Sequence, residues 1–142
     1  MVLPKTETAI WLALKSAVSQ IITNPVLPTF DPGAIVEPPA SSAPFLLLSD
    51  VRNDKGRPFI GKGDAVQSGT LMLNVQWPLA RPVDHTQLME LGATIAANFP
   101  ADKCIQYGGV RIRVTRDSDA LASYIDGIYR VVPVRVFWTT ML

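Results

Sequence analysis

Alternating hydrophobic and polar residues mark two strands near the end of the chain, over residues 109–116 and 128–139. In the first, Val110, Ile112 and Val114 alternate with arginine and threonine, which is typical of a strand with one buried face. The second differs, because its even-numbered and its odd-numbered positions are both mostly apolar. In a small antiparallel sheet covered by helices on one side, the other face should be polar. We therefore expect a second copy of the protein to cover this last strand.

The predicted subunit interface lies on the odd-numbered face of the last strand. It consists of Tyr129, Val131, Pro133 and Phe137. Proline has no backbone N–H, so Pro133 favours an edge or irregular position for this strand. We expect a neighbouring subunit to cover these side chains.

Helical periodicity appears in two places. An amphipathic helix is predicted from Thr6 to Thr23, where apolar side chains recur every three or four residues. A second helix is predicted from the N-cap Asp84 to Phe99, with Gln87 placed to complete a capping box. Gly92 on this helix would allow a close approach to a sheet.

Two more strands are predicted between the helices, over Phe45–Arg52 and Gly69–Trp77, and a long hairpin loop at 53–68 joins them. A proline-rich arm at 24–44 precedes them and holds six of the twelve prolines. We expect no regular element in this arm.

The predicted order is helix, strand, strand, helix, strand, strand. It favours an α+β fold, in which a mainly antiparallel four-stranded sheet carries two helices on one face. The 142 residues are enough for a single domain spanning 1–142.

Composition supports a partner surface and offers no bulk attraction to nucleic acid or membrane. Charged residues make up 18% of the chain, below the usual quarter, and the formal net charge is +1. Cys104 is the only cysteine, so we expect no intrachain disulfide and a reducing compartment. Glu7 and Lys15 interrupt the apolar residues near the N-terminus, and no apolar run approaches the ~18 residues of a membrane span. We expect a protein made in the cytoplasm, without a signal peptide.

Catalytic chemistry is sparse in this sequence. His85 and Cys104 lie far apart in the sequence, and neither has a paired base or nucleophile beside it. Asp117, Asp119 and Asp126 do not have the spacing of an EF-hand loop, and the glycines do not have that of a phosphate-binding loop. We predict no catalytic, metal or cofactor residues. Two rival classes stay open: a small hydrolase that uses Cys104 or His85, and a monomeric module whose proline-rich arm is a ligand.

Two pairs of residues carry further functional predictions. Arg111 and Arg113 share one face of their strand, and they form either an ordinary solvated face or a basic surface facing a polyanion or an acidic neighbour. Phe59 and Ile60 are large apolar residues in the middle of a polar loop. They pack either on their own domain or on a partner.

The order of these elements resembles that of the tail terminator (tail-completion, minor tail) proteins of long-tailed bacteriophages. The likeness covers nearly the whole chain. It rests on the opening helix, the arm ending in Ala43-Pro44-Phe45-Leu46, the glycine- and lysine-rich loop before Gly69, the segment 96–100, and the closing segment 129–134. None of these is a catalytic fingerprint.

This resemblance implies a structural virion protein and not an enzyme. It implies a homohexameric ring at the tail-neck junction that caps the tail tube, ends tail elongation and joins the head-side connector or stopper. Its implied partners are further copies of itself, the tail tube protein, the end of the tape measure protein, and genomic DNA passing through the lumen without sequence recognition. Another neck or head-completion subunit is the alternative. Within this reading, Phe59 and Ile60 contact the tail, and Arg111 and Arg113 face the channel or an acidic partner.

Overall fold

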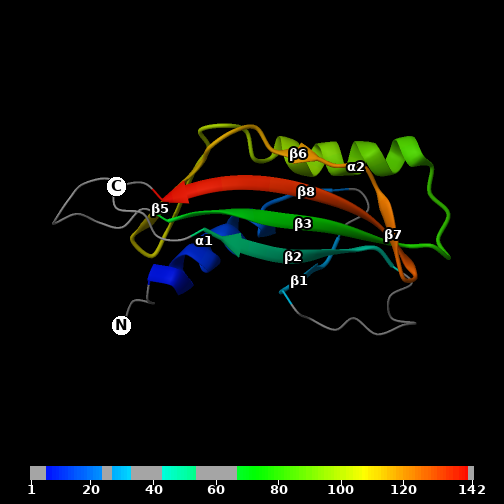
Figure 1. The fold of residues 1–142 in the computed structure, drawn as a ribbon, viewed down its shortest axis with the longest axis horizontal. Helices are drawn as coiled ribbons and strands as arrows, with labels where there is room; N and C mark the ends of the chain where they lie inside the picture. The colour runs from blue at the N-terminus through cyan, green and yellow to red at the C-terminus, as the bar shows by residue number, and fades with distance from the viewer. Residues whose placement is uncertain (1–5, 24–26, 33–42, 54–66, 141–142) are drawn as a thin grey trace.

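Three long antiparallel strands form the centre of the sheet in the computed structural model (Figure 1). The structure describes residues 6–23, 27–32, 43–53 and 67–140. The central strands are β2 (Phe45–Arg52), β3 (Ser68–Pro78) and β8 (Tyr129–Thr140). They match the alternating pattern of the sequence, and the predicted bounds of β2 are confirmed.

Five shorter strands complete an eight-stranded sheet: β1 (Thr29–Phe30), β4 (Cys104–Tyr107), β5 (Val110–Val114), β6 (Asp119–Ala120) and β7 (Tyr124–Asp126). The sheet order is β1-β2-β3-β8-β5-β4, and β6 and β7 also pair with β8. The pairing of β1 with β2 is parallel, whereas the other pairs are antiparallel, so the sheet is mixed. The α+β class is confirmed, but the prediction of a four-stranded antiparallel sheet is wrong.

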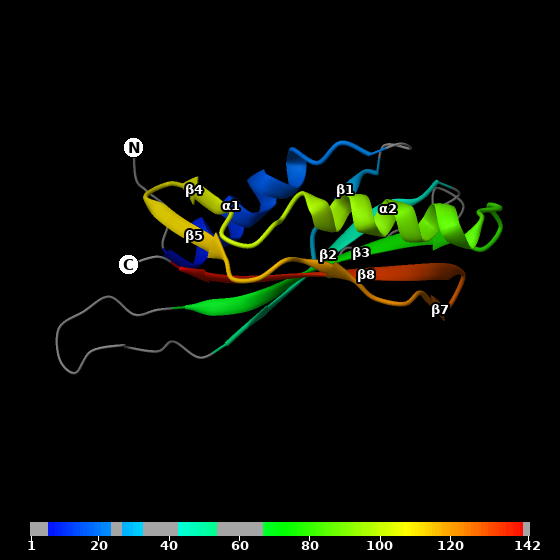
Figure 2. The ribbon, with the colours of Figure 1, turned by 90° about the horizontal axis from the view of Figure 1, so that it is seen from above.

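Both helices, α1 (Thr6–Ser19) and α2 (His85–Ala97), lie on the same side of the long strands (Figure 2). The sheet curls at one end, so that β4 and β5 rise beside α1 (Figure 2). Between the helices and the sheet, the core contains three residues of β3 and four of β8: Leu71, Leu73, Val75, Val132, Val134, Val136 and Trp138. The periodicity of the sequence therefore identified the correct buried face of the long strands.

The helix ends differ from the predicted ones. Backbone bonds from Gln20 to Ala17 (3.2 Å) and from Ile21 to Val18 (3.1 Å) close the last turn of α1 tightly, before the predicted end. Asp84 is the N-cap of α2, but its side chain makes no capping hydrogen bond, so the predicted capping box is not formed.

Gly92 brings α2 close to the sheet, as predicted. A Cβ atom at this position would lie 2.9 Å from Cγ1 of Val132 and 3.2 Å from Cβ of Ala120. Both distances are shorter than an ordinary carbon contact. Because glycine has no side chain, α2 can pack this closely against β6 and β8.

An ion pair on the helix side of β2 ties the sheet to the start of α1. Arg52 donates from Nε to Asp50 (2.9 Å) and from Nη2 to the carbonyl oxygen of Glu7 (3.0 Å). Its guanidinium also lies 5.9 Å from the ring centroid of the buried Trp138. One arginine thus links β2, β8 and α1.

Two further expectations are corrected. The last strand is not an edge strand, because β8 pairs with β3 on one side and with β5, β6 and β7 on the other. The proline-rich arm does contain a regular element, the short strand β1. The connection at 117–127 contains two short strands, β6 and β7, and both pair with β8.

Candidate assembly surfaces

The face of the long strands that points away from the helices, here called the open face, carries a cluster of arginine, aspartate and phenylalanine. Arg135 on β8 donates two hydrogen bonds to Asp119 on β6, at 3.0 and 2.5 Å. The guanidinium of Arg116 lies 3.7 Å from the ring centroid of Phe137, and that of Arg135 lies 5.2 Å from it. The two cations therefore share one aromatic ring, and one of them has a fixed counter-ion.

Electrostatics in this cluster favours the ionised pair. The hydrogen bonds from Arg135, and the charges of Arg135 and Arg116, hold the pKa of Asp119 below its ordinary value, although desolvation opposes this. The same carboxylate raises the pKa of Arg135. Both shifts favour the ionised forms of Asp119 and Arg135, so this pair is a fixed charge arrangement on the surface.

Of the predicted interface residues, Tyr129 and Phe137 are half-buried, whereas Val131 and Pro133 are buried within the subunit itself. Tyr129 packs edge-on against Phe45, with ring centroids 5.3 Å apart, and Phe45 packs in the same way against Phe30 at 5.2 Å. Tyr129 and Phe137 thus retain surface for a partner. The assignment of all four residues to an interface stays a prediction.

Arg111 and Arg113 lie exposed on one side of β5, opposite the buried Ile112 and Val114. Arg113 donates to Asp102 at 3.0 Å. This ion pair is exposed, so it contributes little to stability. The alternation inferred from the sequence is confirmed, and the partner of these arginines stays a prediction.

The candidates for catalysis do not form a site in the described part of the chain. His85 lies exposed at the start of α2, and Cys104 is exposed on β4. The described residues contain no group of three or more His, Cys, Asp or Glu that could hold a metal ion. The predicted contact residues Phe59 and Ile60 lie outside the described residues.

Large apolar side chains are exposed along the side of the sheet formed by β6, β7 and the turn into β8. The set comprises Leu121, Tyr124, Ile125 and Ile128, together with Met89 of α2 and Leu79 after β3. We call these six residues the β6–β7 surface. Leu79 adjoins Ile128 directly, because its N–H donates to the Ile128 carbonyl oxygen at 2.8 Å. The sequence held a signal for this surface, since a solvated loop rarely carries so many large apolar residues.

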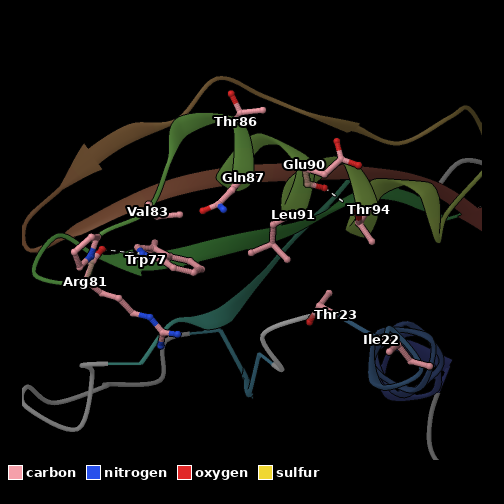
Figure 3. Close-up of a pocket in the computed structure, with 11 residues that line it drawn as sticks. Ile22, Thr23, Trp77, Arg81, Val83, Thr86, Gln87, Glu90, Leu91 and Thr94 are labelled. Carbon is pink, nitrogen blue, oxygen red and sulfur yellow. Dashed lines mark hydrogen bonds between the residues drawn. The ribbon is translucent and has the colours of Figure 1, made fainter.

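A cleft of about 860 Å³ lies on the other flank of α2. Residues of α2 and of the segment before α2 form one side of the cleft, and Ile22 and Thr23 form the opposite side (Figure 3). Trp77 and Leu91 form its floor. Trp77 donates from Nε1 to the carbonyl oxygen of Arg81 at 3.0 Å. We call this feature the helix cleft.

Exposed apolar surface beside a cleft is typical of a protein that binds partners. The chain belongs to the family described as phage tail terminator protein, whose profile matches residues 9–138. The family is structural, so the protein is a structural component of phage tails and of the virion, associated with other tail components.

Comparison with solved structures shows the same fold elsewhere. One solved chain superimposes with a TM-score of 0.74 at 17% sequence identity, over 98% of each chain. At that identity the likeness concerns the fold alone. No curated protein sequence matches the chain. Among the described residues, no helix has the length and apolar character needed to span a membrane.

Proposed function

We propose that this protein forms a homohexameric ring that caps the finished tail tube, stops its elongation and provides the joint to the head-side connector. The observation that carries this proposal is the family match, which spans residues 9–138 and so includes both helices and nearly all of the sheet. The exposed apolar β6–β7 surface supports it, because apolar area of that kind is usually covered by a partner.

The open face suggests an additional area of contact between neighbouring subunits of the ring. Tyr129 and Phe137 on the open face retain area for a neighbouring subunit, and Val131 and Pro133 would support that contact from beneath. Such a contact needs about 800 Å² from each subunit to be stable.

The partners follow from the position of a cap between tail and head. One side of the ring contacts the tail tube protein and the end of the tape measure protein, through Phe59 and Ile60 of each subunit. The other side contacts the connector or stopper. Arg111 and Arg113, exposed on β5, face the channel or an acidic neighbour, and DNA passes the lumen without sequence recognition.

An elongation assay tests this function. Tail tubes are assembled from purified tube protein, incubated with this protein, and then supplied with fresh tube subunits. We expect rings on one end of each tube in negative stain and no further growth at that end, whereas untreated tubes lengthen. Tubes that grow past the bound protein would contradict the proposal. Binding to the head-side connector without binding to tubes would indicate another neck subunit instead.

A further inference from the structure

The β6–β7 surface combines exposed apolar side chains with an unpaired strand edge. All three residues of β7 are exposed, and β7 pairs only with β8 in the described sheet. Tyr124 is 51% exposed and Ile125 is 63% exposed. An edge strand of this kind offers free backbone groups and apolar area to another chain.

The apolar area of this surface is close to what a stable contact requires. Aliphatic side chains contribute roughly 60–120 Å² each when fully exposed, and a tyrosine roughly 150–250 Å². The six residues are each about half exposed, with values from 38% for Leu121 to 63% for Ile125, which gives roughly 350 Å² in total. One side of a standard interface buries about 800 Å², of which about 450 Å² is apolar.

A groove beside α2 extends this surface. It has a volume of about 370 Å³ and lies between α2 and β6. Its walls are mostly small residues, with Met89 and Leu121 among its larger lining side chains. The small residues here allow a chain from outside to approach the helix closely.

The helix cleft offers a concave surface on the opposite flank of α2. The residues of α2 that line the cleft are Thr86, Gln87, Glu90, Leu91 and Thr94, whereas those lining the groove are Met89, Ala93, Ala96 and Ala97. Arg81 is exposed at the cleft, and Asp126 is exposed at the end of β7. The cleft is lined by both polar and apolar side chains, with Arg81 as its basic and Glu90 as its acidic residue. A projecting apolar edge thus matches its apolar floor, and a docked edge would place Asp126 at the Arg81 end.

From these observations we propose that the β6–β7 surface of one subunit docks into the helix cleft of a second copy of this chain. The inference deepens the proposed function and rests on it, because two different surfaces on one subunit give a head-to-tail contact, which closes into a ring when the rotation between subunits allows. Docking covers Ile125 and Ile128 of one subunit and Ile22 of the next, whose side chain is 87% exposed in the single subunit.

Complementation between two disabled variants tests the docking. The edge variant is Tyr124→Asp with Ile125→Asp, and the cleft variant is Ile22→Asp with Thr94→Asp. All four positions are exposed, so circular dichroism should show native folding in both. Val51→Asp, at a 58% exposed position on β2, is the matched control. Ile128→Lys serves as a second edge variant.

Sedimentation velocity gives the result. We expect rings for the wild type and for Val51→Asp, and monomers for the edge variants and the cleft variant alone. An equimolar mixture of the double edge variant and the cleft variant should form a species of twice the 15.5 kDa subunit mass and nothing larger, because each pair retains one intact contact.

Several outcomes would overturn the docking. The docking is wrong if the mixture of the two variants stays monomeric, or if the cleft variant forms dimers by itself. It is also wrong if Val51→Asp disrupts the ring as much as the edge variants do, or if the wild type is monomeric at every concentration. Rings in both disabled variants would also overturn it, while leaving the proposed ring function intact. Failure of the wild type to cap tail tubes would instead contradict the function itself.

Discussion

Replacing Gly69 with alanine should destabilise the protein, because three neighbours surround this position. A Cβ atom at residue 69 would collide with the backbone carbonyl oxygen of Val51 and would lie 2.9 Å from Cζ2 of Trp138 and 3.2 Å from Cα of Arg52. The first neighbour is backbone in the paired strand β2, and the second is a core side chain that is 1% exposed. Neither can move without disturbing the sheet.

The expected cost of Gly69→Ala is about 2 kcal/mol in the free energy of unfolding. Overpacking typically costs about 1–3 kcal/mol, and this position belongs at the upper end because one contact is to backbone. Alanine also restricts the unfolded chain more than glycine does, and this offsets about 0.4–1 kcal/mol of the overpacking cost. In a protein of this size, such a loss lowers the melting temperature by roughly 4–8 °C.

Urea unfolding and thermal melting of the wild type and Gly69→Ala measure this effect. Thr70→Ala, a truncation at the half-buried next position in β3, is the control for changing a residue of this strand. Thr70→Ala should lower the free energy of unfolding by well under half of the loss expected for Gly69→Ala. A Gly69→Ala protein as stable as the wild type would refute the close packing of β2, β3 and Trp138 described above.

Three further predictions concern charge and packing. Asp119→Asn should lower the free energy of unfolding at pH 7, and its difference from the wild type should shrink as the pH falls below about 4, because the carboxylate with its lowered pKa stabilises the fold only while it is ionised. Urea midpoints of both proteins across pH 2–7 would check this, and a difference independent of pH would contradict it. Phe45→Ala should lower the free energy of unfolding by about 3–5 kcal/mol, because Phe45 is 4% exposed and packs against both Phe30 and Tyr129. Chemical denaturation measures this loss, and a value under about 1 kcal/mol would show that these three aromatic rings are not part of the core. Replacing Arg111 and Arg113 together by lysine should preserve phage titre, whereas replacement by glutamate should reduce it without unfolding the subunit; normal titres for the glutamate variant would leave these arginines as ordinary surface residues.

The sequence predicted the long strands and both helices, because their periodic patterns reflect burial on one face. β4 was missed because it is short and only Ile105 among its residues is buried, which leaves no alternation to detect. Gly108 and Gly109 form the two-residue hairpin turn between β4 and β5, which their positive φ angles of 55° and 83° allow.

The position of the last strand was mispredicted for a physical reason that concerns Pro133. Its carbonyl oxygen accepts a hydrogen bond from Leu121 at 2.8 Å, on the side of β8 where β6 and β7 pair. The N–H and C=O of one residue in an antiparallel strand face the same neighbour, so the position where proline lacks an N–H faces the gap between β6 and β7 and not β3. A proline can thus occupy an interior strand, which the general preference for edges does not anticipate.

Sequence reasoning recognised that apolar surface exceeds what the fold needs and assigned it to the last strand, an assignment that stays a prediction. The apolar character of Val131 and Pro133 reflects burial within the subunit. Further exposed apolar area, which sequence reasoning did not identify, lies one connection earlier, at Tyr124 and Ile125. Only the pairing of β7 with β8, a tertiary contact, shows which of these residues remain uncovered.

The central claim, that this protein ends tail elongation, is tested most directly by the length of phage tails made without it. Cells are infected with phage whose copy of the gene carries an early stop codon, and tail lengths are measured by negative-stain electron microscopy with and without the protein supplied in trans. The account predicts tails of abnormal, widely distributed length that lack a ring and do not join heads, and a return to uniform length on complementation. Tails of uniform, normal length in the absence of the protein would contradict it.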